Sequence, residues 1–446
     1  MSMTQNDDNG CEPHCPIPAQ LEVVRVVAML ECIIYIAIGF LLGAISGLTP
    51  GLHINTFAAI LLALSPRLLD LGLEPQHLAV LIVASSISQT FLDIIPAVFV
   101  GAPDADTSLA VLPGHQLMLE GRGMEAIRLS ALGSAGAVIV ALLAIYPLSI
   151  IIGRGYQQLL DHMGLILVGI ACLMILSEAG PAVEGRGAWA AYKYKALGLL
   201  LFLTSGLLGL FAFSNQHLLK SYLGLEPSPL LPLLSGLFGA SFLVASLASQ
   251  TSIPPQEDKG FSMRPASLAR SMLIGGLAGS VVAWIPGVSP AVATTVARIG
   301  APRSAEEFLV SLSGVNTANA MLALVALHVV GRARSGAAAA IQDLVEMDLD
   351  LLSLLIMAGA ATAILSYIAT LAAGGLAARI VDQIDYQTLS LAILLGLSLM
   401  AILFTGVLGW LIFLIATVVG LIAPYAGIRK THAMGALMLP LIVQYL

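Results

Sequence analysis

Residues 39–56 read GFLLGAISGLTPGLHINT, and residues 275–292 repeat the same pattern of glycine and proline as GGLAGSVVAWIPGVSPAV. Aligned without gaps, the two stretches share glycine at the first and fifth positions and a Pro-Gly pair at the twelfth and thirteenth. Glycines four residues apart let a second helix approach closely. A Pro-Gly pair breaks a helix, because proline cannot donate a backbone hydrogen bond and glycine tolerates unusual dihedral angles. Each stretch therefore predicts a tightly packed helix that breaks after Gly51 or Gly287 and is followed by a half-helix.

A second polar segment follows in each half of the chain. The first half has SSISQTFLDIIP at residues 85–96, and the second half has SLSGVNTAN at residues 311–319. Setting Thr90 on Thr317 aligns these segments at nearly the same spacing as the Pro-Gly pairs. Two repeats, each with two interrupted polar helices, are typical of secondary transporters.

The composition places the chain in a membrane. Hydrophobic residues make up 58% of the 446 residues, charged residues only 10%, and the mean hydropathy is +0.95, whereas soluble domains carry about 25% charged residues. Apolar runs such as 126–152 and 351–371 reach the roughly 20 residues that a spanning helix needs, and they lack the alternation of barrel strands. We therefore expect an all-α polytopic membrane protein with about ten to twelve membrane-inserted segments. The run at 389–422 is long enough for two crossings, with a break at Thr405-Gly406.

The repeats divide the chain into four parts. We predict a polar N-terminal tail at 1–27, a first transmembrane repeat at 28–250, a polar linker at 251–265 and a second transmembrane repeat at 266–446. Loosely matched loops differ in charge, because the first half carries acidic residues where the second half carries arginines, and positive loops favour the cytoplasm. Inverted insertion of the two repeats is therefore the expected topology.

Broken helices supply the chemistry of an anion site. The N-terminus of a half-helix has unpaired N–H groups and a partial positive charge, so it attracts anions. Asp93 is an isolated carboxylate among apolar neighbours, which is costly in a membrane unless it is paired or hydrated, and it is the strongest candidate for binding a coupling cation. The predicted substrate-binding residues are Pro50, Gly51, His53, Asn55, Thr56, Pro286, Gly287, Ser289, Thr294, Asn316, Thr317 and Asn319, and the predicted ion-coupling residues are Ser88, Gln89, Thr90 and Asp93.

Structural roles compete with several of these assignments. His53 fits a helix cap or an interface as well as a site. Asn316, Thr317 and Asn319 also fit hydrogen bonds between neighbouring helices, which membrane bundles require. The charges of the two matched loops fit ordinary loop positions slightly better than site positions; these residues are Asp104, Asp106, Arg332 and Arg334.

Other binding classes find little support. Cys11, His14 and Cys15 in the tail offer three ligands where a zinc site usually has four, so we expect no metal site. The formal net charge of -7 is spread among loops and predicts no nucleic-acid surface. No cofactor is expected apart from Na⁺ or H⁺ as a coupling ion.

The same residues carry a family resemblance. The Pro50-Gly51 helix, the run PGHQLMLEGRG at 113–123, and IPGVS at 285–289 followed by Glu306-Glu307-Phe308 resemble the large membrane subunit of the tripartite tricarboxylate transporters. GLHINT at 51–56 is similar to the archaeal-type branch, and the resemblance runs from around residue 37 to the end. It implies an ion-driven translocation path for carboxylate anions, with a small membrane subunit and an extracytoplasmic binding protein as partners.

The chain also departs from that family. Members similar to bacterial citrate carriers have a second Pro-Gly break where this chain has GRARSG at 331–336, and an acidic residue before the asparagine pair. The exact substrate and the coupling ion therefore stay open. We expect a multi-pass protein of the cell membrane, in contact with lipid, that moves a di- or tricarboxylate by alternating access, and we leave open whether it forms a homodimer.

Two other functions are alternatives. PGVSP at 286–290 resembles a motif of the polyprenyl-phosphate translocases, and helix N-termini suit phosphate as well as carboxylate. The first motif of that group usually continues Ser-Gly-Gly, which Leu52-His53-Ile54 does not match. An intramembrane enzyme is less favoured, because the sequence has neither a His-Glu-x-x-His motif nor a Gly-x-Ser-x-Gly elbow.

Overall fold

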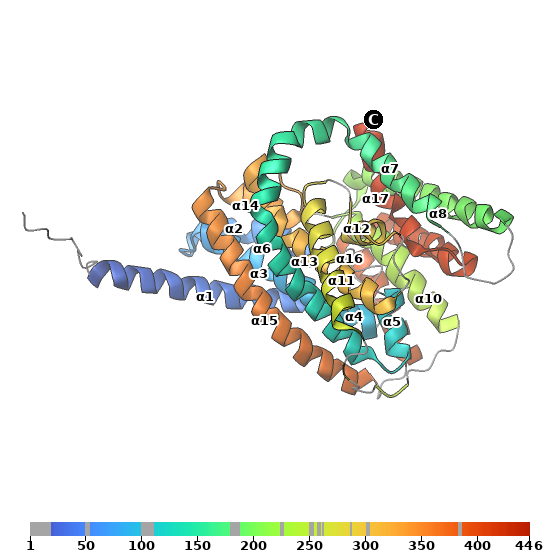
Figure 1. The fold of residues 1–446 in the computed structure, drawn as a ribbon, viewed down its shortest axis with the longest axis horizontal. Coiled ribbons are helices and arrows are strands. Elements are labelled where there is room, and N and C mark those ends of the chain that lie inside the picture. Colours follow the sequence, from blue (N-terminus) through green and yellow to red (C-terminus); the bar gives the residue numbers. More distant parts are fainter. Residues whose placement is uncertain are drawn as a thin grey trace, which may run out of the picture.

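The computed structural model describes residues 19–49, 54–99, 111–178, 188–223, 227–248, 254–256, 260, 263–285, 288–299, 304–381 and 386–446. Within these residues the chain is helical and has no strand. Eight of the described helices are long and apolar enough to cross a membrane, and the apolar segments 163–176 and 230–245 are shorter. The predicted all-α polytopic membrane fold is confirmed (Figure 1).

The helices fall into two successive sets. The first set is α1 (Ala19–Leu48), α2 (Ile54–Asp70), α3 (Pro75–Leu92), α4 (Ile94–Phe99), α5 (Val111–Leu119), α6 (Gly123–Asp161), α7 (Met163–Leu176), α8 (Ala188–Ser214), η1 (Gln216–Leu218), α9 (Leu230–Leu234), η2 (Ser235–Ala240) and α10 (Ser241–Ala248). The second set is α11 (Pro265–Val282), α12 (Pro290–Ala297), α13 (Ala305–Val330), α14 (Gly336–Leu344), α15 (Leu349–Val381), α16 (Tyr386–Ala426), η3 (Lys430–Met434) and α17 (Gly435–Tyr445). α1 already begins inside the segment predicted as a tail.

Each half packs a glycine-rich helix against a polar one. α1 lies along α3, and α11 lies along α13. A β-carbon at Gly43 would come within 2.2 Å of the Ser85 carbonyl oxygen, and one at Gly279 within 2.4 Å of the Val315 carbonyl oxygen. Backbones this close require a residue without a side chain, so the aligned glycines serve the same packing in both halves.

The two halves also exchange a long helix. α6 of the first half packs on α11 and α13, whereas α15 of the second half packs on α1 and α3. The side-chain oxygens of Ser130 in α6 and Ser313 in α13 lie 2.7 Å apart. As a result, the spans containing α3 and α13 are the most buried of the candidate spans, in the middle of Figure 1.

Helices are interrupted where the Pro-Gly pairs predicted a break. α1 ends at Leu48 and α2 begins at Ile54, and α11 ends at Val282 and α12 begins at Pro290. The Pro-Gly pairs themselves lie outside the described residues. Pro290 suits the first turn of α12, because an N–H group there would have no partner within the helix, and the Ser289 hydroxyl caps that turn by accepting a hydrogen bond from the Val292 N–H.

The second polar segment behaves differently in the two halves. In the first half α3 ends and α4 begins on either side of Asp93, as predicted. In the second half α13 runs unbroken through residues 311–319, so the predicted interruption there is wrong. This segment contains no proline, and Gly314 instead gives room for α6 and α11, because a β-carbon there would lie 3.2 Å from the Gly133 carbonyl oxygen. The helix ends later, at Val330, and is capped by Gly331, which has φ of 69°.

α16 is a helical hairpin, as the length of its apolar run predicted. Gly406 has φ of 72° and ψ of -168°, which interrupts the helix. The Trp410 indole N–H donates to the Ser398 hydroxyl at 2.8 Å, although twelve residues of straight helix would separate such positions by about 18 Å. The Tyr222 N–H donates to the Leu403 carbonyl at 2.9 Å, which satisfies a carbonyl near the break.

Candidate functional site

A cavity of about 460 Å³ lies between the two halves of the chain. Its walls come from the α3–α4 junction, the start of α12, the middle of α13, the turn before α14, and parts of α8, α9, α11 and α17. The volume is within the range of small-molecule sites. The polar lining residues are Ser86, Gln89, Thr90, Asp93, Ser289, Asn316, Asn319, Arg334, Ser335 and Gln444, and the apolar ones are Phe213, Leu230, Leu234, Val282, Ala283, Ile285, Val288, Pro290, Ala320, Ala323, Leu437, Pro440 and Leu441.

Two hydrogen bonds join the polar helices of the two halves at this cavity. The Asn316 amide donates to the Asp93 carboxylate at 3.0 Å, and the Thr317 hydroxyl donates to the Thr90 hydroxyl at 3.1 Å. Thr90 and Thr317 are the residues that the sequence alignment set on each other. Asp93 is only 3% exposed, so its carboxylate is drawn out of bulk water and held at the seam between the halves.

The structure brings many of the predicted residues together. Gln89, Thr90, Asp93, Ser289, Asn316 and Asn319 all line the cavity. Thr317 does not line the cavity itself but is hydrogen-bonded to Thr90, which does. Members of both predicted sets, the ion-coupling and the substrate-binding residues, therefore line the same cavity although they lie far apart in the sequence.

Other predicted residues lie elsewhere. The Ser88 hydroxyl donates to the Phe40 carbonyl at 2.9 Å and the Thr294 hydroxyl donates to the Pro290 carbonyl at 2.7 Å, so both serve helix packing and do not line the cavity. Pro50, Gly51, His53, Pro286 and Gly287 lie outside the described residues, and α2 includes Asn55 and Thr56 without a described position for their side chains. Asp104 and Asp106 also lie outside the described residues.

Arg334 lines the cavity, although an ordinary loop role is what the sequence alone favours for it. It lies in the turn between α13 and α14, whereas its neighbour Arg332 is exposed. Its guanidinium carbon lies 5.1 Å from the centre of the Tyr156 ring in α6. Ser335-Gly336 indicates a helix start directly after the arginine, but it does not show that the guanidinium faces the cavity.

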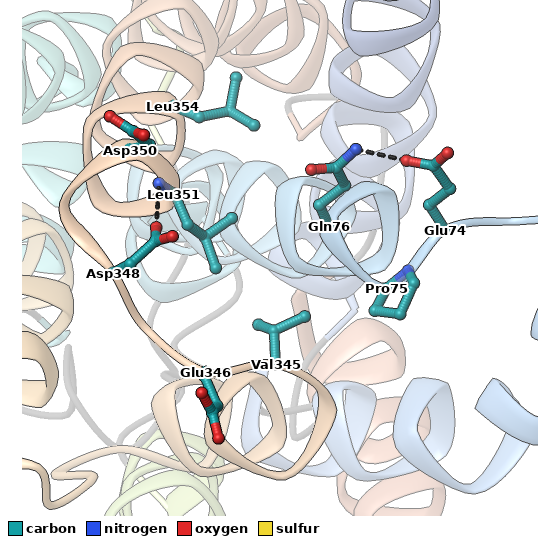
Figure 2. A pocket seen from close by; sticks show the side chains of 9 residues that line it. All are labelled: Glu74, Pro75, Gln76, Val345, Glu346, Asp348, Asp350, Leu351 and Leu354. Atoms are coloured by element: carbon teal, nitrogen blue, oxygen red, sulfur yellow. Dashed lines mark hydrogen bonds between the residues drawn. The ribbon is translucent and has the colours of Figure 1, made fainter.

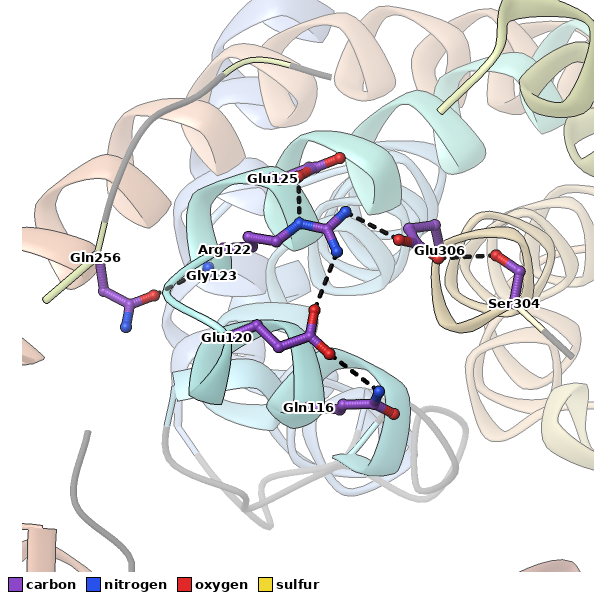
Figure 3. Close-up of polar contacts among 8 residues, drawn as sticks. All are labelled: Gln116, Glu120, Arg122, Gly123, Glu125, Gln256, Ser304 and Glu306. Atoms are coloured by element: carbon purple, nitrogen blue, oxygen red, sulfur yellow. Dashed lines mark hydrogen bonds and ion pairs between the residues drawn. The ribbon is translucent and has the colours of Figure 1, made fainter. Parts of the chain in front are cut away.

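A charged network connects the halves at another position. Figure 3 shows Arg122, before α6, donating to Glu125 at 2.8 Å, to Glu120 at 3.0 Å and to Glu306 at the start of α13 at 2.8 Å. The hydrogen bond that Arg122 donates to Glu125 contributes most to raising the pKa of Arg122 above its ordinary value, against the opposing effect of burial. The Gln256 side chain accepts from the Gly123 N–H at 2.9 Å, so the segment between the repeats is attached to the same turn.

A second hollow opens beside α3, α14 and α15. It has a volume of about 530 Å³ and carries the carboxylates of Glu74, Glu346, Asp348 and Asp350 (Figure 2). The Asp348 carboxylate accepts from the Leu351 N–H at 2.7 Å and so caps α15. Among the described residues no group of histidine, cysteine and acidic side chains is arranged to hold a metal ion.

A buried basic cluster lies behind the cavity, around η3. Lys430 donates to the Phe238 carbonyl at 2.8 Å, and His432 lies 2.9 Å from the Glu178 carboxylate. The Ser289 hydroxyl at the cavity wall contacts the Met434 sulfur at 3.7 Å. η3 follows the last candidate span, and burial lowers the pKa of the Lys430 ammonium from 10.5 to about 7.

We expect this lysine to make the protein more stable as the pH rises from about 7 to about 10.5. In this window the unfolded chain binds a proton at Lys430 that the folded protein releases, so raising the pH favours the folded state, by at most about 1.4 kcal/mol per pH unit. Below pH 7 the full cost of burying the ammonium is present. The melting temperature of purified protein at pH 7, 8 and 9 should rise for the wild type and rise less for Lys430→Gln, which stays neutral. Equal pH dependence in the two proteins would contradict this assignment.

Comparisons with known proteins agree with this architecture. A family model described as the tripartite tricarboxylate transporter TctA family matches residues 33–435. An uncharacterized protein of Methanocaldococcus jannaschii is 25% identical over 426 residues, which cover 93% of this chain and 99% of that protein. No solved structure matches the chain significantly.

Proposed function

The chain belongs to the tripartite tricarboxylate transporter TctA family, and from this premise we propose that it is a permease subunit that moves a di- or tricarboxylate across the cell membrane, coupled to Na⁺ or H⁺. The family is one of transporters, and the eight apolar candidate spans agree with a multi-pass membrane protein. Family membership supports transport by a tricarboxylate-type carrier, and the substrate, the coupling ion and the transport cycle are our proposal.

The observation that carries the proposal is the cavity between the halves, with Asp93 and Asn316 in its wall. Polar residues inside a membrane bundle are costly and mark substrate and ion pathways. Transporter sites lie where internal repeats meet at interrupted helices. Here Asp93 marks an interrupted helix of the first half, and Ser289 caps a half-helix of the second half.

Asp93 is the proposed site of the coupling cation. Its carboxylate is buried and can stabilise Na⁺ or hold a proton. A cation at this position reduces the repulsion between Asp93 and an entering carboxylate. Binding of the ion and of the substrate would thereby favour each other.

Alternating access in this proposal moves one half against the other, with inverted insertion of the repeats. The Asn316–Asp93 and Thr317–Thr90 hydrogen bonds join the halves within the cavity, and the Arg122–Glu306 ion pair joins them elsewhere. Movement of one half against the other would break these hydrogen bonds and this ion pair and replace them with other contacts. A small membrane subunit and an extracytoplasmic binding protein are the proposed partners, since the family is tripartite.

One feature favours a second candidate, a polyprenyl-phosphate translocase. Apolar side chains such as Phe213, Leu230 and Leu441 form much of the cavity wall. They would tolerate an isoprenoid chain beside a phosphate headgroup, because both a phosphate and a carboxylate bind to cationic side chains.

Reconstitution into proteoliposomes separates the candidates. We expect uptake of radiolabelled di- or tricarboxylate that depends on an imposed Na⁺ or H⁺ gradient and collapses with an ionophore. Vesicles from the same preparation should not flip a polyprenyl phosphate. Flipping of the lipid without carboxylate uptake would replace the proposed function with the second candidate, and the binding protein should be added in a parallel reaction to test whether it is required.

A further inference from the structure

The cavity holds a cationic side chain that the described part of the chain leaves without an anionic partner. We propose that the Arg334 guanidinium binds a carboxylate group of the transported anion. The proposal rests on the proposed function and adds to it the residue that recognises the substrate and the chemistry of that recognition.

The turn that carries Arg334 is fixed on both sides. α13 ends at Val330, and the Gln342 side chain of α14 donates to the Gly331 carbonyl at 3.0 Å and accepts from the Ala333 N–H at 3.2 Å. On the other side, the Ser335 hydroxyl accepts from the Ala338 N–H at 3.1 Å and caps α14. The backbone around Arg334 is therefore held in place before any substrate arrives, which lowers the entropic cost of binding.

The guanidinium itself is oriented and has donors available. It lies over the Tyr156 ring, a cation–π contact that helps to position the group. Among the described residues no acceptor bonds its Nε and Nη2, although both atoms are buried. Burial lowers the pKa of Arg334, and Tyr445 acts in the opposite direction. Buried donors without acceptors are unfavourable, so an acceptor from outside the described chain would relieve this cost.

The nature of that acceptor follows from the geometry of the group. Nε and one terminal nitrogen of a guanidinium form two parallel N–H donors, which match the two oxygens of a carboxylate. Arg334 and Asp93 are the charged side chains among the described lining residues. A dicarboxylate bound at Arg334 and the Asp93 carboxylate together leave two negative charges in the cavity, and a monovalent cation at Asp93 would reduce them to one. The neutral side-chain amides of Asn319 and Gln444 can donate hydrogen bonds to the second carboxylate group.

Binding to purified protein tests the proposal without relying on uptake. Isothermal titration calorimetry in detergent should be carried out with citrate, succinate and inorganic phosphate, in the presence of Na⁺, on the wild type, Arg334→Gln, Arg334→Lys and Arg332→Gln. We expect Arg334→Gln to weaken carboxylate binding about 10- to 100-fold. Arg334→Lys should bind with intermediate affinity, because it keeps the charge but loses the planar fork. Arg332→Gln removes an exposed neighbouring charge and should stay within about twofold of the wild type.

Chemical protection gives a second readout that needs no variant to fold. Phenylglyoxal modifies arginine side chains, and mass spectrometry of the digested wild-type protein reports Arg334 and Arg332 separately. The carboxylate that binds should protect Arg334 and leave Arg332 reactive. Unchanged carboxylate affinity in Arg334→Gln, or equal modification of Arg334 with and without the carboxylate, would overturn the Arg334 assignment alone. A wild-type protein that binds phosphate but no carboxylate would overturn the proposed function and this inference together.

Discussion

Asp93→Asn should abolish ion-coupled carboxylate uptake, lowering its initial rate at least about 100-fold. The change keeps the size of the side chain and removes the charge of a carboxylate that is 3% exposed. Hydrogen bonds to charged groups contribute roughly 1.5–3 kcal/mol each, and about 1.4 kcal/mol corresponds to a tenfold change in affinity. Removing the Asp93 charge also removes its attraction to a bound cation, about 4 kcal/mol at 4 Å and an effective dielectric constant of about 20, which accounts for the expected effect. The measurement is radiolabelled uptake into proteoliposomes under an Na⁺ or H⁺ gradient.

Three comparisons separate coupling from damage to the fold. Asp93→Glu keeps the charge with a longer side chain and should retain part of the uptake. Asp70→Asn removes an exposed carboxylate at the end of α2 and should leave the rate unchanged. In Asp93→Asn, exchange of substrate at equal concentrations on the two sides of the membrane should be less impaired than gradient-driven uptake. Uptake at the wild-type rate in Asp93→Asn would contradict the assignment of Asp93 as the site of the coupling ion.

Several polar residues of this cavity could be picked out from the sequence, because polar and charged side chains within an apolar membrane segment are energetically costly. A carboxylate among Phe91, Leu92 and Ile94 needs a reason to be in a membrane, and the alignment of Thr90 with Thr317 indicated where the halves would meet. In the structure these threonines are hydrogen-bonded to each other. Residues on the seam between two repeats are predictable, because repetition brings matched positions together.

Arg334 could not be assigned in the same way. A charge in a short polar turn is most often solvated, and the sequence does not reveal which of Arg332 and Arg334 points inward. The choice depends on the Tyr156 ring, which comes from a helix far away in the chain. Contacts of this kind are set by tertiary packing and leave no local pattern.

Helix interruptions were predictable only where the backbone itself requires them. Proline and glycine predicted the ends of α1 and α11 and the hairpin at Gly406. The polar run in α13 also suggested an interruption, but serine, asparagine and threonine can remain helical when neighbouring helices accept their hydrogen bonds. Ser313 faces α6 in this way, so its polarity served packing and did not break the helix.

Gly133→Ala should lower the free energy of unfolding by about 1–3 kcal/mol, the usual cost of overpacking. The added β-carbon would lie 2.3 Å from the Val310 carbonyl oxygen, at the contact between α6 and α13. A backbone carbonyl in a helix cannot rotate away as a side chain could, so the two helices must separate. The same change relieves the low helix propensity of glycine by at most about 1 kcal/mol, which is too little to offset a backbone clash.

Gly155→Ala is the matched control, because it lies in the same helix and its β-carbon would meet nothing within 4 Å. It should leave the melting temperature unchanged or raise it slightly through helix propensity alone. Thermal unfolding of the two variants in one detergent therefore isolates the effect of the α6–α13 contact. Ser130 and Ser134 bond α13 on either side of Gly133, so separating the helices also weakens the seam that encloses the cavity, and uptake should fall in Gly133→Ala and persist in Gly155→Ala. Equal melting temperatures would mean that α6 and α13 do not pack this closely, and the exchange of helices between the two halves would lose its main support.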